Sequence, residues 1–284
     1  MLSYRHGFHA GNHADVLKHM VLCLILRQLK QKGKPLTYID THSGAGAYSL
    51  KSAWSQQTGE YKNGVDKIIN NSLLRELVPD YYKIINDINE GSGALNYYPG
   101  SPMFAAQICD ENDSANFMEL HPTEYENLKY NLHHYSYCHV HHRDAAEGLP
   151  ALLPPAIRRG LIFIDPSYEL ENDYKNTISL VKNAYTKFPQ GIFAIWYPLL
   201  GKASNHAYEF IRGITKLNIR RTVRAEFTVC AQDTLMGMHG SGMVVCNAPF
   251  GFKENLDKIL PEITEQLAID KTAEFKLEKL TPDD

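Results

Sequence analysis

Apolar residues recur at three- and four-residue intervals in the segment that follows Asn12. These positions are Val16, Leu17, Met20, Val21, Leu24 and Ile25. Their spacing is that of one face of an amphipathic helix. Asn12 can cap the start of the helix, and Gly33 followed by Pro35 marks its end. Lys18 and His19 stand one step off the apolar stripe, so we expect both side chains to be able to face a ligand.

Short apolar runs bounded by turn residues predict the strands of a sheet. The expected strands span residues 36–39, 115–118, 137–142, 161–164, 191–198, 220–230 and 242–247. Residues 161–164 are apolar at every position, which is typical of a strand buried on both faces in a parallel sheet. The last two strands are expected to pair as a hairpin around residues 236–240. The pattern predicts an α/β fold with a mostly parallel sheet and an antiparallel last strand.

The strand ends carry acids and glycines. Asp40 ends the first strand and precedes Gly44 and Gly46, and Glu119 ends the next. A dinucleotide fold places its ribose-binding acid about 20 residues after the glycines, whereas here 73 residues separate Gly46 from Glu119. We interpret the excess as a small helical insertion, residues 51–99, in a single domain that spans residues 1–284.

Elements inside and after the insertion follow from local signals. Residues 81, 84, 85 and 88 are apolar at helical spacing. Ser101 is expected to cap a helix whose first position is Pro102. Beyond Pro261 we expect a charged amphipathic helix and then a frayed end.

Composition indicates a soluble cytoplasmic chain. The protein has 284 residues, of which 44% are hydrophobic and 21% charged, with a formal net charge of −3. Its five cysteines include no C-x-x-C pair, which favours reduced thiols over a disulfide framework. The apolar run from Met20 to Leu26 is too short to span a bilayer. The net charge by itself does not indicate a nucleic-acid partner.

The first 35 residues differ from this average. They contain six basic residues against the single acid Asp15, with four histidines and the aromatic residues Tyr4 and Phe8 among them. This pattern fits phosphate and base contacts, and it also fits a solvated segment leading into a helix. Neither these histidines nor those between residues 133 and 142 complete a metal-ligand set, so no metal is predicted. A second basic cluster faces RNA or is merely solvated: Arg212, Lys216, Arg220, Arg221 and Arg224.

The block Asp165-Pro166-Ser167-Tyr168 follows the most apolar strand. A carboxylate, a peptide carbonyl and an aromatic ring together suit an exocyclic amine, because the oxygens accept its protons and the ring stacks on its base. Asp and Pro are also ordinary turn formers, so this block alone fits a simple strand end equally well.

In this order the strand-end groups resemble class I S-adenosylmethionine-dependent methyltransferases, which have a Rossmann-like sheet. The Asp165 block is similar to the (Asp/Asn)-Pro-Pro-Tyr motif of the branch that methylates amines. Residues 2–19 (LSYRHGFHAGNHADVLKH), 40–46 (DTHSGAG) and 98–102 (YPGSP) resemble the RlmJ family of 23S rRNA adenine-N6 methyltransferases over essentially the whole chain. Ser167 departs from the motif's second proline. The change leaves the Asp165 and Pro166 oxygens in place but loosens the turn.

The resemblance implies roles for particular residues. Asp165, Pro166 and Tyr168 would be catalytic. S-adenosylmethionine would be contacted by His19, His42, Ser101, Glu119, Asp144 and Ala145. Tyr4, His6 and Lys18 would contact the RNA. The implied substrate is the adenine at nucleotide 2030 of 23S rRNA, modified by a monomeric enzyme. Two other functions fit the same pattern: methylation of DNA adenine, and non-catalytic RNA binding on a methyltransferase fold. A protein-glutamine substrate is disfavoured by Asp rather than Asn at 165.

Overall fold

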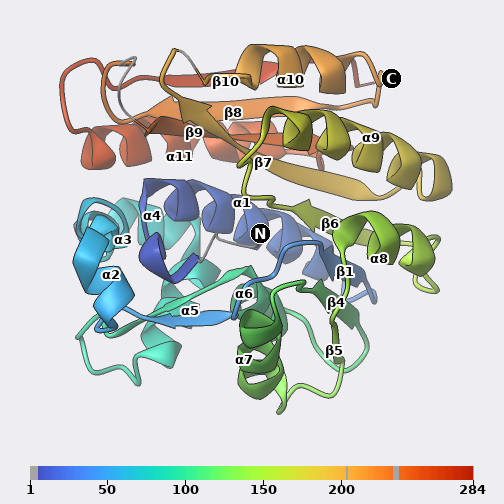
Figure 1. Ribbon diagram of the computed structural model, residues 1–284, viewed down its shortest axis with the longest axis horizontal. Coiled ribbons are helices and arrows are strands. Elements are labelled where there is room, and N and C mark those ends of the chain that lie inside the picture. The colour runs from blue at the N-terminus through green and yellow to red at the C-terminus, as the bar shows by residue number, and fades with distance from the viewer. Residues whose placement is uncertain (1–5, 203, 233–236, 284) are drawn as a thin grey trace.

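The computed structural model describes residues 6–202, 204–232 and 237–283 (Figure 1). At its centre is an eight-stranded sheet with the order β10-β8-β9-β7-β6-β1-β4-β5. The strands are β1 (Thr37–Asp40), β4 (Ser114–Met118), β5 (Cys138–His141), β6 (Gly160–Ile164), β7 (Ile192–Leu200), β8 (Val223–Thr228), β9 (Met238–Cys246) and β10 (Phe275–Lys279). The α/β class predicted from the sequence is confirmed.

The pairing of the strands divides the sheet into two parts. The five strands from β5 to β7 are parallel, and β9 runs antiparallel to β7. The expected β8–β9 hairpin is present, although β9 already begins at Met238, inside the segment expected to be a loop. A helix does continue beyond Pro261, but it is α11 (Phe252–Leu267), which begins before that proline. The frayed end was predicted wrongly, because residues there form β10, which pairs antiparallel with β8 and occupies its edge.

Two layers of helices cover the sheet and explain the apolar run at 161–164. Leu161 and Phe163 face a core shared with α1 (His13–Lys30), α6 (Ser101–Ile108), α7 (Pro122–Leu132) and α11. Ile162 and Ile164 face the opposite core, shared with α8 (Ala145–Leu152), α9 (Glu171–Lys187) and α10 (Ala207–Thr215). Figure 1 shows α8, α9 and α10 on one side of the sheet. A strand between two helical layers needs apolar side chains on both faces.

Helix α1 is far more buried than its amphipathic pattern suggested. The Asn12 side chain caps it as predicted, accepting from the Asp15 N–H. Every residue from Ala14 to Leu26 is buried, including Lys18. Lys30, further along, pairs with Asp110 and Asp113. The helical part of the basic N-terminal segment is therefore neither a solvated tail nor an open basic surface. No helix in the described ranges is long and apolar enough to cross a membrane.

The segment interpreted as an insertion, residues 51–99, contains α2 (Ala53–Thr58), the 3₁₀ helix η2 (Glu60–Asn63), α3 (Val65–Ile68), α4 (Ser72–Leu77) and α5 (Pro79–Ile88). It lies between β2 (Ala47–Ser49) and its own last element, β3 (Tyr97–Pro99), and these two strands pair antiparallel. Its helices lie at the left of Figure 1. The helix that follows begins one residue earlier than expected, because Gly100 occupies the cap position and Ser101 is the first helical residue.

The insertion holds the N-terminal 3₁₀ helix η1 (His6–Phe8). The Phe8 ring stacks on Trp54 of α2, with 5.6 Å between the ring centroids. Glu60 lies 2.9 Å from His9 Nδ1 and accepts a hydrogen bond of 2.9 Å from the Asn12 side chain. These contacts fix the segment that leads into α1, and with it the position of His6.

Candidate active site

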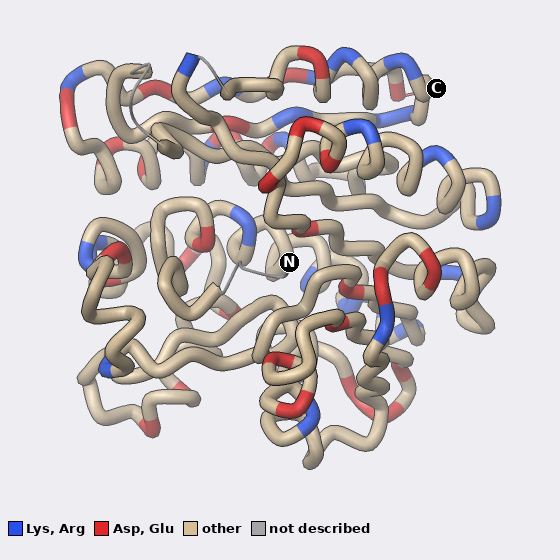
Figure 2. Tube along the Cα trace, viewed as in Figure 1, with Lys and Arg blue, Asp and Glu red and all other residues tan. Residues whose placement is uncertain are grey.

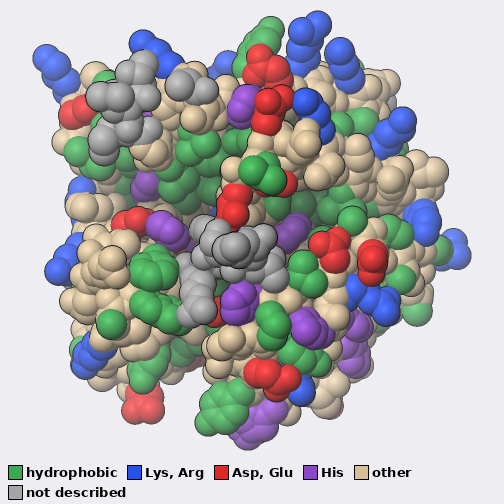
Figure 3. Space-filling view, viewed as in Figure 1, with side chains coloured by type: hydrophobic (Ala, Val, Ile, Leu, Met, Phe, Trp, Pro, Cys, Tyr) green, Lys and Arg blue, Asp and Glu red, His purple; other side chains and the backbone are tan. Residues whose placement is uncertain are grey.

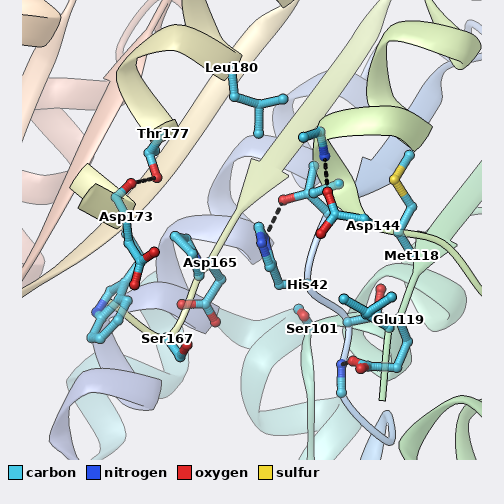
Figure 4. Close-up of a pocket in the computed structure, with 18 of the residues that line it drawn as sticks. His42, Ser101, Met118, Glu119, Asp144, Asp165, Ser167, Asp173, Thr177 and Leu180 are labelled. Atoms are coloured by element: carbon cyan, nitrogen blue, oxygen red, sulfur yellow. Dashed lines mark hydrogen bonds between the residues drawn. The ribbon is translucent and has the colours of Figure 1, made fainter. Parts of the chain in front are cut away.

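A cavity of about 660 Å³ opens at the carboxyl edge of the parallel strands. Loops that follow β1, β4, β5 and β6 meet there, together with Lys18 and His19 of α1, the N-terminal end of α6 and one side of α9 (Figure 4). Residues predicted from the sequence that line it are His6, Lys18, His19, His42, Ser101, Glu119, Asp144, Ala145, Asp165 and Pro166. Parallel strands deliver their carboxyl ends to one edge, which is why groups so distant in sequence converge.

The turn after β1 contains two glycines in the left-handed region of backbone conformation. Gly44 and Gly46 have φ values of +62° and +81°, a region that other residues enter at a cost. A Cβ on Gly44 would also lie 2.1 Å from the Tyr48 hydroxyl. The turn brings the Gly44 N–H to the Glu119 Oε2 at 2.7 Å. The glycines thus join the first loop of the cavity to the carboxylate at the end of β4.

Both acids assigned to the cofactor are held by backbone groups. Glu119 accepts from Gly44 N–H on Oε2 and from His121 N–H on Oε1, at 2.7 and 2.6 Å. Asp144 caps α8, its Oδ1 accepting from the Ala146 N–H at 2.7 Å. Each carboxylate oxygen carries a second lone pair, so both groups can also accept hydrogen bonds from a ligand. Figure 4 shows Glu119 and Asp144 on the same side of the cavity.

Two histidines of the cavity are uncharged. His19 is buried, with its Nδ1 2.9 Å from the Tyr98 hydroxyl, and burial lowers its pKa well below the usual value. His42 lies with its Nδ1 2.8 Å from the Thr41 hydroxyl, and burial lowers its pKa too. Neutral imidazoles do not repel a cationic ligand, so this wall of the cavity suits a positively charged sulfonium.

A chain of charged groups leads from Asp165 to His6. The ammonium of buried Lys18 lies 2.7 Å from Asp165 Oδ2 and 2.7 Å from Asp15 Oδ1. Asp15 Oδ2 in turn lies 2.9 Å from His6 Nε2 and accepts from the Gly11 N–H at 2.8 Å. Burial alone would raise the pKa of Asp15, but His6 and Lys18 hold it well below its usual value. Asp15 therefore stays ionised and fixes Lys18 against Asp165.

The sequence predictions had assigned His6 and Lys18 to RNA contacts and had not singled out Asp15. A signal was available, because Asp15 is the only acid among the first 35 residues and precedes Lys18 by three positions on a helix. Trp196 of β7, which the sequence did not single out as a site residue, also lines the cavity. Tyr4 lies outside the described residues.

The position of Tyr168 corrects the expectation that its ring stacks on a substrate base. The ring is buried beside Tyr174 and Phe210 of α9 and α10. Its hydroxyl donates a 2.7 Å hydrogen bond to the Trp196 carbonyl. Backbone φ at Tyr168 is +49°, and this left-handed turn accompanies a ring directed into the core instead of the cavity. Tyr168 therefore supports the strand that carries Trp196.

Trp196 supplies an aromatic surface to the cavity. Its indole N–H donates to the Ser241 hydroxyl at 2.8 Å, which fixes the orientation of the ring. The Lys18 ammonium lies 5.5 Å from the ring centroid, within reach of a cation–π contact. Because Lys18 also contacts Asp165, the indole and the carboxylate flank the same part of the cavity.

Asp40 at the end of β1 gives the protein a specific pH dependence. It is buried, it accepts from the Tyr38 hydroxyl at 3.0 Å, and burial raises its pKa from 3.8 to about 7. The native state then binds the proton more tightly than the unfolded chain. The free energy of unfolding should accordingly fall as pH rises from about 4 to about 7, by at most about 4 kcal/mol.

Asp40→Asn carries no titrating proton and should lack this contribution. We expect urea denaturation at pH 4.5 and pH 8 to show a smaller loss of stability with rising pH in the variant than in the parent protein. An identical pH dependence in the two proteins would contradict the shifted pKa of Asp40.

The histidine-rich segment 133–142 supplies a strand, as expected, and β5 covers Cys138–His141. In the part of the chain that the structure describes, no group of three or more His, Cys, Asp or Glu side chains is placed to hold a metal ion.

The fold and the site have the arrangement of a class I methyltransferase. The sheet is Rossmann-like, a glycine turn follows β1, carboxylates follow β4 and β5, and the Asp-Pro block follows β6. A model of the family described as "Ribosomal RNA large subunit methyltransferase D, RlmJ" matches residues 33–281. The chain belongs to this family.

Individual relatives agree with this assignment. The chain is 41% identical to a Haemophilus influenzae protein and 39% identical to an Escherichia coli protein, each over 283 residues and the full length of both partners. Both relatives are named "Ribosomal RNA large subunit methyltransferase J". A crystal structure of a Legionella pneumophila protein is similar with a TM-score of 0.87 and 37% identity, covering 95% of this chain and 98% of that one.

Proposed function

We propose that this protein transfers a methyl group from S-adenosylmethionine to the N6 amine of one adenine in 23S rRNA, at nucleotide 2030. The observation that carries the proposal is Asp165, which follows β6 beside the Pro166 carbonyl and which, among the residues that the structure describes, is held by Lys18 through Oδ2. That contact leaves Oδ1 to accept from a substrate amine. The family and the names of its relatives support the substrate class.

The cofactor suits the residues of the cavity. A volume of about 660 Å³ lies within the range of small-molecule sites. The Glu119 carboxylate would accept from the two ribose hydroxyls, while Asp144 and the neighbouring Ala145 would contact the adenine. His19, His42 and Ser101 would line the part nearer the methionine. When bound, S-adenosylmethionine supplies an activated methyl group.

In the proposed reaction, the protein aligns a weak nucleophile, the adenine amine, with the methyl group. The lone pair of an adenine amine is delocalised into the ring. If Asp165 Oδ1 and the Pro166 carbonyl each accept one N–H, the nitrogen is drawn toward tetrahedral geometry and its lone pair is aimed at the methyl group. Orientation of this kind is worth roughly 7–11 kcal/mol in well-aligned systems. The charge on Asp165, kept by Lys18, also offsets the positive charge that grows on nitrogen.

We assign base stacking to Trp196 instead of Tyr168. The two tryptophans of the chain are Trp54 and Trp196, so Trp54→Phe leaves Trp196 as the single indole reporter. Titration of this variant with an adenine-containing RNA should quench its fluorescence. Trp196→Leu should raise the KM for RNA by a factor of about 5 or more, because base–aromatic stacking contributes about 1–3 kcal/mol. Unchanged fluorescence and an unchanged KM would refute the assignment.

The direct test is methylation of 23S rRNA that lacks the modification. Purified protein and isotopically labelled S-adenosylmethionine should yield N6-methyladenosine at one nucleotide, identified by mass mapping of nuclease fragments. An RNA with guanine at nucleotide 2030 and a DNA oligonucleotide of the same sequence are the controls. Label in the DNA alone would favour a DNA methyltransferase. RNA binding without label would favour a non-catalytic module.

We further propose that the enzyme acts as a monomer in the cytoplasm. The cavity of a single chain already contains the groups proposed to bind the cofactor and the target amine. A ribosomal RNA substrate is made and assembled in the cytoplasm of a bacterium.

A further inference from the structure

A second groove, also of about 660 Å³, lies away from the active-site cavity, between α10 and the outer strands β8 and β10. One wall is formed by the residues of α10 and its C-terminal end, Tyr208, Ile211, Arg212, Thr215 and Lys216. The other wall comes from the sheet, with Arg224, Glu226, Thr228, Lys276 and Glu278. The proposed reaction uses none of these side chains.

The groove carries excess positive charge. Arg224 pairs with Glu226 and with Glu278, and Lys276 lies 3.4 Å from Glu278. Glu226 also accepts from the Tyr197 hydroxyl at 2.6 Å. The two carboxylates are thus matched by two cations of the same strands. Arg212 and Lys216 are exposed and, among the described residues, form no ion pair, so their charges are in excess.

An aromatic ring accompanies these two cations. Tyr208 is 72% exposed, so most of its ring is open to solvent. Tyr208, Arg212 and Lys216 follow one another at intervals of four residues and therefore share one side of α10. Figures 2 and 3 show Lys and Arg gathered along the upper and right margins of the molecule, over α9 and α10. Alternating cations and exposed aromatic rings are typical of surfaces that bind single-stranded nucleic acid.

The groove and the active-site cavity are linked by one strand. Trp196 of β7 lines the cavity, and Leu199 of the same strand lines the groove. Three residues of extended chain span about 10 Å, which a few nucleotides of RNA can bridge. The whole protein carries a net charge of −3, so RNA is attracted only where positive charge is concentrated.

We propose that the groove between α10 and β8–β10 binds the RNA strand next to the target adenine, with Arg212 and Lys216 on phosphates and Tyr208 stacked on a base. The inference rests on the proposed RNA substrate and adds a second anchoring point to it. The groove then contributes to substrate affinity while the chemical step stays with the cavity.

The test compares two double variants that remove the same charge. Arg212→Gln/Lys216→Gln alters the groove, and Lys253→Gln/Lys258→Gln alters α11 on the opposite face of the sheet. With a 23S rRNA fragment, the groove variant should bind about tenfold more weakly or worse at 0.1 M salt. The slope of log K against log salt should fall by about 1.4–1.8 in magnitude, as for two lost phosphate contacts. The α11 variant should retain the affinity and slope of the parent protein.

Steady-state kinetics and cross-linking complete the test. The groove variant should have a raised KM for RNA with kcat and S-adenosylmethionine affinity unchanged, and Tyr208→Ala should raise KM about fivefold or more. Ultraviolet cross-linking of RNA to the unmodified protein should label a peptide of α10 or β10. Wild-type binding by the groove variant, or cross-links confined to the cavity, would overturn the inference. Groove binding by a parent protein that methylates nothing would instead overturn only the proposed function.

Discussion

Asp165→Ala should abolish measurable methyl transfer while S-adenosylmethionine still binds. The substitution removes the oxygen expected to accept from the target amine and the charge that balances the developing cation. Loss of one preorganised electrostatic contact in an active site lowers kcat by about 10²- to 10³-fold, and here alignment is lost as well. The rate is measured by incorporation of labelled methyl groups into unmodified 23S rRNA, and cofactor binding is measured by calorimetry.

Two further variants test whether the effect depends on the charge of Asp165 and whether it is specific to that position. Asp165→Asn keeps a side-chain oxygen but loses the charge that pairs with Lys18, so it should retain more activity than Asp165→Ala and less than the parent. Asp257→Ala removes an exposed carboxylate on α11 and should have no effect on the rate. Parent-level incorporation by Asp165→Ala would exclude the carboxylate from catalysis and with it the mechanism proposed here.

Glu119→Ala should weaken S-adenosylmethionine binding by well over 1 kcal/mol, which is more than about fivefold in Kd. Two ribose hydroxyls would lose a charged acceptor, and hydrogen bonds to charged groups contribute about 1.5–3 kcal/mol each. The N–H groups of Gly44 and His121 would also lose their partner. The cavity should therefore lose both a ligand contact and the brace of its glycine turn.

Calorimetric titration of the apo protein measures this effect directly. Glu126→Ala, an exposed residue of α7 close to the same site in sequence, is the matched control and should bind with the parent affinity. The affinity of Glu119→Gln should lie between those of Glu119→Ala and the parent protein, because an amide keeps one acceptor but presents an N–H to the backbone. If Glu119→Ala binds S-adenosylmethionine with the affinity of the parent protein, Glu119 does not contact the cofactor.

The features predicted correctly from the sequence are those fixed by local patterns. Alternation and apolar runs located the parallel strands, and the strands in turn placed Asp40, Glu119 and Asp165 at one edge of the sheet. In each case a few adjacent residues determine the outcome, so no knowledge of distant partners is needed.

The features that were missed depend on partners far away in the chain. The orientation of Tyr168 is set by its contacts with α10 and its hydrogen bond to β7. Trp196 reaches the cavity because Ser241 of β9 holds its indole. The strand β10 forms because β8 offers it an unpaired edge. None of these contacts can be predicted from the sequence pattern around the residue concerned.

The attachment of η1 to α2 and η2 affects which substitutions can alter the activity of the enzyme during evolution. Phe8 stacks on Trp54 and His9 contacts Glu60, while His6 contacts Asp15, which also pairs with Lys18. Displacing α2 or η2 would therefore be transmitted to the ammonium that steadies Asp165. Substitutions far from the methyl donor can thus tune turnover without altering a single residue of the cavity wall.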